Sequence, residues 1–190
     1  MKNLLNSIET LLKKKPNAII AVDGCCASGK TTFASKLEKK LDFQVIHTDD
    51  FFLPPEMRSA ERFKQIGGNI HYERFNDEII NPLKENKDFE YRIFSCKTGT
   101  FCGTKQISTD KPIVIEGAYA LHPKFDDIYD LRVFFTIDSQ TQLKRILARN
   151  GAVSLEAFKN KWIPFENRYF DAFGIKDKCD IVIEKVRDIP

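Results

Sequence analysis

The chain has 190 residues, a length that fits one compact domain with a substantial core. Apolar residues make up 42% and charged residues 30% of it, and the formal net charge of +3 is too small to indicate nucleic-acid binding. No apolar stretch is long enough to cross a membrane, no signal-peptide core is present, and the five cysteines form no CxxC pair, so we expect a cytoplasmic protein without a disulfide framework or zinc site.

The first half of the chain alternates predicted helices and strands. Apolar residues at helical spacing predict an opening helix that ends at Pro16-Asn17. The continuous apolar run at residues 18–22 predicts a strand that is buried on both faces, as in parallel sheets. A helix over residues 31–41 and a strand over residues 43–47 follow. Residues 48–73 read as a long loop, and loops of this length are usually functional or hold short helices.

The second half continues the alternation after an insert. Asn76 is the predicted N-cap of a helix, and residues 89–94 and 106–108 predict a small hairpin-like insert. Further strands are predicted over residues 112–116, 131–137 and 181–183, and helices are predicted from Ser139, with a capping box to Gln142, and from Leu155 to Tyr169. We interpret Trp162 in the last helix as a core residue. The pattern predicts a single α/β domain over residues 1–190, with a parallel central sheet in three layers and a small insert.

A phosphate-binding motif follows the first predicted strand. Residues 24–31, GCCASGKT, match the pattern GxxxxGK[ST] and open a helix, which is the context that this P-loop requires. Loop N–H groups and the positive end of the helix bind phosphates, Lys30 adds a charge for the β- and γ-phosphates, and Thr31 offers a hydroxyl ligand for Mg²⁺. We therefore predict that the loop binds ATP or GTP together with Mg²⁺, with ATP as the expected cofactor, and that Lys30 is partly exposed. The predicted nucleotide-binding residues are Gly24, Ala27, Ser28, Gly29, Lys30, Thr31 and Thr32.

Three further groups of charged residues belong to the same hypothesis. Asp49 and Asp50 follow a strand at the edge where open α/β sheets bind ligands, and they either serve the reaction or cap the next segment. Glu116 ends another strand, and we interpret it as an acid near Mg²⁺ rather than as a solvent-facing residue. Arg145 and Arg149 share a helix face and either close over phosphates or form a solvated basic face.

In this order and spacing, the motifs resemble the uridine kinase family of P-loop kinases. The matching positions are the P-loop, the block Asp49-Asp50-Phe51-Phe52, the pair Glu116-Gly117 and the helix with Arg145 and Arg149. The resemblance implies a P-loop NTPase fold with a five-stranded parallel core and a lid. It also implies a catalytic set in which Asp49 is the base for the acceptor hydroxyl, Lys30 binds phosphate, Arg145 and Arg149 are lid arginines, and Thr31 and Glu116 serve the metal.

The acceptor side departs from the family pattern. Where the family has an acidic residue after an asparagine, this chain has His71 in Asn69-Ile70-His71, and Cys96 stands near the place of an expected histidine. The lid looks shortened around Asn150-Gly151. The resemblance matches Tyr91 to a tyrosine near the acceptor's base. The predicted substrate contacts are Asp49, Phe51, His71 and Tyr91.

The sequence thus predicts an ATP-dependent kinase that phosphorylates a hydroxyl of a nucleoside, such as uridine or cytidine, or of a similar small metabolite. Nicotinamide riboside, pantothenate and other metabolites are alternative acceptors. A nucleotide-sensing module without kinase activity is an alternative of another class. A GTPase switch would need an Asn-Lys-x-Asp run after a late strand, and the chain has none.

Overall fold

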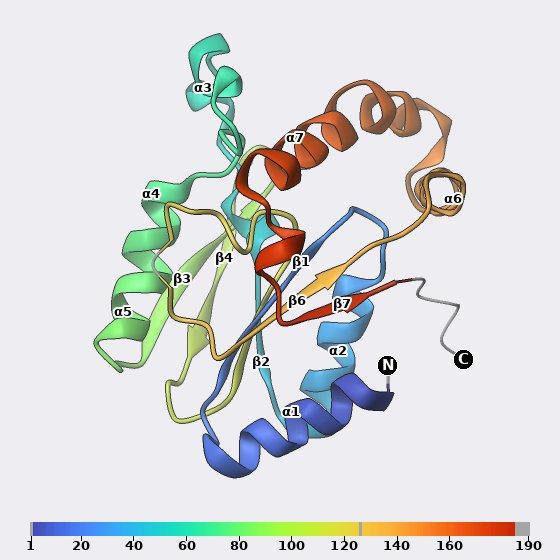
Figure 1. Ribbon diagram of the computed structural model, residues 1–190. Helices are drawn as coiled ribbons and strands as arrows, with labels where there is room; N and C mark the ends of the chain where they lie inside the picture. The colour runs from blue at the N-terminus through green and yellow to red at the C-terminus, as the bar shows by residue number, and fades with distance from the viewer. Residues whose placement is uncertain (1, 126, 185–190) are drawn as a thin grey trace.

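The computed structural model describes residues 2–125 and 127–184. Its centre is a five-stranded parallel sheet with the strand order β2-β5-β1-β6-β7, which confirms the predicted α/β fold (Figure 1). The strands are β1 (Ile19–Gly24), β2 (Gln44–His47), β5 (Ile113–Glu116), β6 (Leu131–Phe135) and β7 (Ile181–Ile183). Each predicted strand of this sheet is present with bounds that shift by at most two residues. The placement of β1 in the middle of the sheet puts the P-loop at the centre of one sheet edge.

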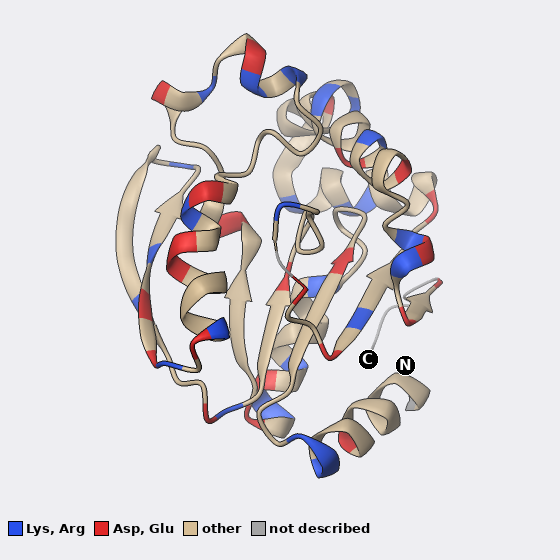
Figure 2. Cartoon of the chain, turned by 60° about the vertical axis from the view of Figure 1, so that its left-hand side comes forward, with Lys and Arg blue, Asp and Glu red and all other residues tan. Residues whose placement is uncertain are grey.

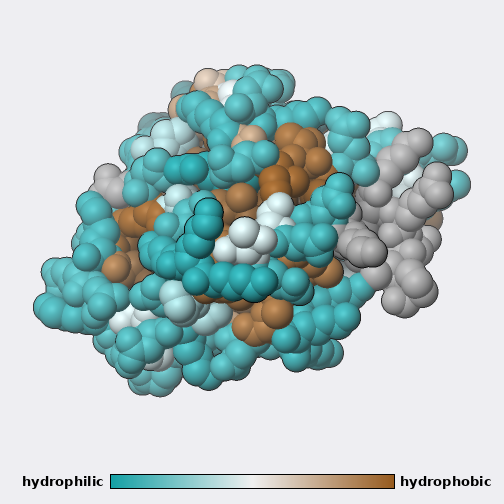
Figure 3. Space-filling model, turned by 60° about the horizontal axis from the view of Figure 1, so that its bottom comes forward, coloured by the Kyte–Doolittle hydropathy of each residue, from teal (hydrophilic) through white to brown (hydrophobic). Residues whose placement is uncertain are grey.

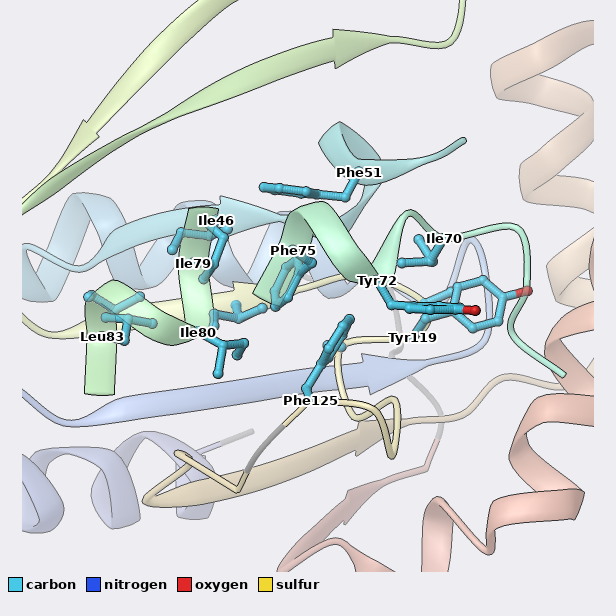
Figure 4. Packing of buried hydrophobic residues seen from close by; sticks show 14 of the residues in the cluster. Ile46, Phe51, Ile70, Tyr72, Phe75, Ile79, Ile80, Leu83, Tyr119 and Phe125 are labelled. Atoms are coloured by element: carbon cyan, nitrogen blue, oxygen red, sulfur yellow. The ribbon is translucent and has the colours of Figure 1, made fainter. Parts of the chain in front are cut away.

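Helices cover the two faces of the sheet because successive strand residues point to opposite sides. Ile20 and Val22 pack against α1 (Lys2–Lys14) and α2 (Lys30–Leu41). On the other face, Ile113 and Ile115 contribute to a larger cluster that includes side chains of α4 (Tyr72–Phe75), α5 (Asn81–Lys84) and α7 (Ile163–Phe173). Figure 4 shows Tyr72, Phe75 and Leu83 of this cluster. The two clusters form the three-layer arrangement that the sequence predicts.

One continuous helical segment on the second face consists of α4 (Tyr72–Phe75), a π-helical turn η3 (Asn76–Ile80) and α5 (Asn81–Lys84). The predicted N-cap at Asn76 is wrong, because this residue lies inside the helical segment. His71 caps it instead: its Nδ1 accepts a hydrogen bond from the Arg74 amide at 3.2 Å. The predicted insert is confirmed as an antiparallel hairpin of β3 (Phe89–Ser95) and β4 (Thr100–Ile107).

The long segment after β2 holds short helical turns. They are η1 (Thr48–Phe51), η2 (Pro55–Met57) and α3 (Ala60–Lys64). Near the C-terminus, α6 (Ser139–Ala157), η4 (Phe158–Trp162) and α7 (Ile163–Phe173) lie above the carboxyl ends of the strands in Figure 1, and η5 (Lys176–Lys178) precedes β7. Asp138, one residue before the predicted capping box, caps α6 by accepting a hydrogen bond from the Thr141 amide at 2.9 Å.

The surface carries mixed charge. Figure 2 shows basic and acidic residues interspersed along the helices and strand ends, in keeping with the small net charge. The face in Figure 3 is mainly hydrophilic, with separate apolar patches between the polar side chains. Within residues 2–125 and 127–184, no helix is both long and apolar enough to cross a membrane.

Candidate active site

A cavity of about 700 Å³ lies at the carboxyl ends of the central strands. Its wall combines the P-loop, the segment after β2, the end of β5 and helices α6 and α7. Ligands of open parallel sheets bind at this edge. Ten of the predicted site residues line the cavity: Ala27, Ser28, Gly29, Lys30, Thr31, Thr32, Asp49, Glu116, Arg145 and Arg149.

The loop between β1 and α2 has the backbone geometry of an anion-binding turn. Gly24 has a φ of 129°, and a Cβ there would lie 2.1 Å from the backbone oxygen of Phe135, so a glycine is required where β1 meets β6. Ala27 adopts a left-handed conformation with a φ of 59°. The first residues of α2, including the exposed Thr31 and Thr32, face the cavity. Loop amides and the helix N-terminus thus form an electropositive cradle for phosphates.

Lys30 is less accessible than the sequence predicts. The residue is only 7% exposed, because its ammonium donates hydrogen bonds to the backbone oxygens of Gly24 at 2.6 Å and Cys25 at 2.8 Å. Burial raises the pKa of three carboxyl groups around it, and the charge of Lys30 opposes this rise in each: Asp23, Asp49 and Glu166. One ammonium therefore compensates several carboxylates in the phosphate site.

Asp49 and Glu116 enter the cavity from the neighbouring strands β2 and β5. His47, the residue opposite Glu116 in the sheet, forms a hydrogen bond between its Nδ1 and Glu116 Oε1 at 2.6 Å, and this bond raises the pKa of His47. Asp49 is accessible inside the cavity, but the surrounding walls and the charge of Glu116 raise its pKa. A raised pKa suits a carboxylate that accepts a proton from a hydroxyl.

The donors at this end of the cavity fit Mg²⁺. Glu116 Oε2 is buried and has no hydrogen-bond partner in the part of the chain that the structure describes. Such an orphaned oxygen is unfavourable unless a cation or a cation-bound water satisfies it. Thr31 presents a hydroxyl in the same cavity. Among the described residues, no cluster of three or more His, Cys, Asp or Glu side chains could hold a metal ion.

The two predicted lid arginines lie on α6 and line the cavity. Arg145 Nη1 donates a hydrogen bond to the backbone oxygen of Ala27 at 3.2 Å. Arg149 lies one turn later, donates to Asn150 Oδ1 at 2.7 Å and also lines the cavity. Gly151, with a φ of 79°, interrupts the helix directly afterwards. The sequence left open whether these arginines close over phosphates or form a solvated basic face. The contact of Arg145 with the loop supports the first interpretation.

Three of the predicted substrate contacts are not among the residues that line the cavity. Phe51 and Tyr91 are fully buried, with ring centroids 5.5 Å apart, and Phe51 also packs edge-on against Phe75 (Figure 4). The Tyr91 hydroxyl donates a hydrogen bond to Asp50 Oδ2 at 3.2 Å. His71 serves as the helix cap. Contact of these three residues with an acceptor therefore stays a prediction.

Other residues complete the cavity without having been predicted. Asn69 is buried and its Oδ1 has no partner among the described residues. Glu166 on α7 accepts a hydrogen bond from the Cys26 amide at 2.9 Å. Trp162, predicted as core, is half-buried and lines the cavity. Further lining residues are Phe52, Leu53, Arg58, Phe63, Cys96, Tyr119 and Phe158. Phe52, Asn69 and Cys96 lie at or near positions of the family resemblance, and the others belong to no motif that would single them out.

The fold and the loop define a P-loop nucleotide-binding protein. The sequence matches the phosphoribulokinase / uridine kinase family over residues 19–189, and the chain belongs to this family.

Individual relatives agree with this membership. The chain is 26% identical to uridine-cytidine kinase B of Dictyostelium discoideum over 184 residues, which cover 90% of this chain and 75% of that protein. It is 27% identical to the uridine kinase of Ureaplasma parvum over 177 residues, covering 85% of this chain and 84% of the relative. The solved structure of a possible uridine kinase from Bacillus stearothermophilus matches with a TM-score of 0.69 at 21% identity, covering 95% of this chain and 99% of that chain. At this identity the structural likeness shows the fold.

Proposed function

We propose that the protein transfers the γ-phosphoryl group of ATP to a hydroxyl of a nucleoside or a similar small metabolite. The observation that carries this proposal is the convergence of the P-loop, Asp49, Glu116 and the two arginines of α6 on one cavity. A loop that binds phosphates needs none of these other groups merely to hold a nucleotide. Their presence beside the loop supports transfer chemistry.

Each group has a role in this proposal. Loop amides and Lys30 hold the phosphates of ATP, and Arg145 and Arg149 stabilise charge on the transferring group. Asp49 orients the acceptor hydroxyl and accepts its proton as the new P–O bond forms, while ADP leaves with the electrons of the broken P–O bond. Thr31 and Glu116 would hold Mg²⁺, which neutralises phosphate charge when bound. Because the transition state of phosphoryl transfer is loose, positioning and electrostatics supply most of the rate enhancement.

The lining of the cavity supports a planar or ring-containing substrate. Phe52 and Trp162 are among its aromatic side chains, and the orphaned Asn69 Oδ1 would accept a hydrogen bond from a substrate hydroxyl or N–H group. The names of the relatives favour uridine or cytidine. Nicotinamide riboside and pantothenate stay as alternative acceptors, since His71 stands where a ribose-binding acid is expected.

Acceptor-dependent release of ADP from Mg·ATP tests the proposal, with Asp49→Asn beside the wild type. Asp50→Asn is a matched control, because Asp50 is the neighbouring acid and does not line the cavity. We expect Asp49→Asn to lose the acceptor-dependent rate by about 10²–10⁴-fold and to keep ADP affinity, as for removal of a general base. Equal rates in Asp49→Asn and Asp50→Asn would contradict the role of Asp49. Nucleotide binding without turnover of any acceptor would favour the sensing module.

A further inference from the structure

Helix α7 contacts the P-loop through a buried carboxylate that the proposed chemistry does not use. Glu166 is only 7% exposed, lines the cavity and accepts the hydrogen bond from the Cys26 amide. On the same face of α7, one turn later, Tyr169 donates a hydrogen bond to Asp23 Oδ2 at 2.8 Å. From α6, Gln142 Nε2 donates to the backbone oxygen of Cys26 at 3.1 Å. The backbone N–H and C=O of Cys26 therefore both form hydrogen bonds with side chains of other helices.

The charge balance around Glu166 is unusual for a site that must bind polyphosphate. Asp23 accepts hydrogen bonds from the amides of Gly24 and Leu121 as well as from Tyr169, so its charge is well satisfied. The titratable groups whose fields reach Glu166 come from four elements around it: Lys30, Asp23, Cys25, Cys26 and Tyr119. Arg145 lies nearby on α6, where it contacts Ala27. Among these titratable groups, Lys30 is the cation whose charge compensates that of Glu166. The same ammonium would also compensate the charge of bound phosphates.

We propose that Glu166 is a positioning residue of the phosphate loop and that its carboxylate takes up a proton when a polyphosphate enters the loop. An incoming polyphosphate places negative charge beside Glu166 and draws on the charge of Lys30. Protonation removes the resulting repulsion, and the neutral carboxyl still accepts the Cys26 N–H through its carbonyl oxygen. The inference rests on the proposed function only in that nucleotide must bind in the loop.

The negative charges of Glu166 and of the bound phosphates determine how ADP affinity changes with pH. The pKa of Glu166 is already raised by burial in the free protein, and bound phosphate raises it further. ADP affinity is therefore highest where Glu166 is protonated in both states, and it falls as the pH rises from the free towards the bound pKa. Across that interval the dissociation constant changes by up to tenfold per pH unit, the slope for one linked proton.

Calorimetric titration with ADP in the absence of Mg²⁺ tests the inference. The binding enthalpy is measured from about pH 5 to 8.5 in buffers of different ionisation enthalpy, so that the slope against buffer enthalpy counts the protons taken up. Glu166→Gln keeps an oxygen acceptor for the Cys26 amide but cannot titrate. Glu156→Gln, an exposed acid on α6, is the matched control. The terminal phosphate of ADP itself titrates near pH ~6, but equally in all three proteins.

We expect the wild type and Glu156→Gln to take up a proton that Glu166→Gln does not, and we expect Glu166→Gln to bind ADP more tightly than the wild type at pH 8. Parallel pH dependence in wild type and Glu166→Gln would overturn the inference while leaving nucleotide binding intact. A residue with a purely structural role would instead weaken binding at every pH. Thermal unfolding checks that Glu166→Gln folds; if it does not, wild-type binding without any proton uptake overturns the inference. Absence of ADP binding by the wild type would overturn the proposed function itself.

Discussion

Replacement of Lys30 by methionine should both stop phosphoryl transfer and destabilise the protein in a pH-dependent manner. The ammonium makes two short hydrogen bonds to loop oxygens and faces the carboxyl groups of Asp23, Asp49 and Glu166. Hydrogen bonds to charged groups contribute about 1.5–3 kcal/mol each, and water or protonation recovers part of this when the cation is lost. We expect a loss of about 2–4 kcal/mol in the free energy of unfolding at pH 8. A domain with an ordinary stability of about 5–15 kcal/mol still folds after such a loss.

The loss should be smaller at pH 5. Burial raises the pKa of Asp23 and Glu166 above the unfolded values of about 3.9 and 4.3, and removal of Lys30 raises both pKa values further. The folded mutant then binds more protons than the unfolded chain, so its stability falls as the pH rises from the unfolded towards the folded pKa values.

Urea unfolding of Lys30→Met at pH 5 and pH 8 measures this difference, with Lys39→Met, an exposed lysine near the end of the same helix, as the control. A deficit equal to that of Lys39→Met at both pH values would refute the reasoning. So would a deficit that shrinks as the pH rises.

Two further predictions concern the cavity wall and the acid near the proposed metal. Phe51→Ala should cost about 3–5 kcal/mol of stability because the ring is fully buried, whereas Trp162→Ala should cost less and should mainly raise the KM for ATP or acceptor. Urea unfolding measures the loss of stability in each variant, and steady-state kinetics measure the KM. A large loss of stability with an unchanged KM in Trp162→Ala would place Trp162 in the core. His47→Gln should raise the Mg²⁺ concentration needed for half-maximal rate by about 10-fold or more, because His47 orients the Glu116 carboxylate. Mn²⁺ binding measured by electron paramagnetic resonance in the presence of ADP should weaken with it, and an unchanged metal requirement would contradict this role.

The central architecture was predictable because several independent signals coincide there. A buried apolar run, two glycines, a lysine and a threonine at fixed spacing leave few alternatives to a strand, a phosphate loop and a helix. The helix caps were less predictable. His71 is not one of the usual capping residue types, and a ring nitrogen accepts the hydrogen bond that an Asn or Ser oxygen would normally accept.

The acceptor side could not be read from sequence for a geometric reason. Phe51 is close in sequence to Asp49, but the turn after β2 directs Asp49 into the cavity and Phe51 into the core, where it packs against Tyr91. Glu166 had no local signature either. Its partner Cys26 is 140 residues away in sequence, and only the docking of α7 on the loop brings the two together.

The central claim is tested most directly by following the γ-phosphate of labelled ATP into an acceptor, with the phosphorylated product identified by mass spectrometry. The panel holds uridine, cytidine, other nucleosides, nicotinamide riboside and pantothenate. We predict that label moves to a hydroxyl of at least one ring-containing acceptor in the wild type and in Asp50→Asn, and that this transfer is lost in Asp49→Asn. Label that stays on ATP or appears only as inorganic phosphate with every acceptor, although ADP binds, would contradict the assignment of this cavity as a kinase active site.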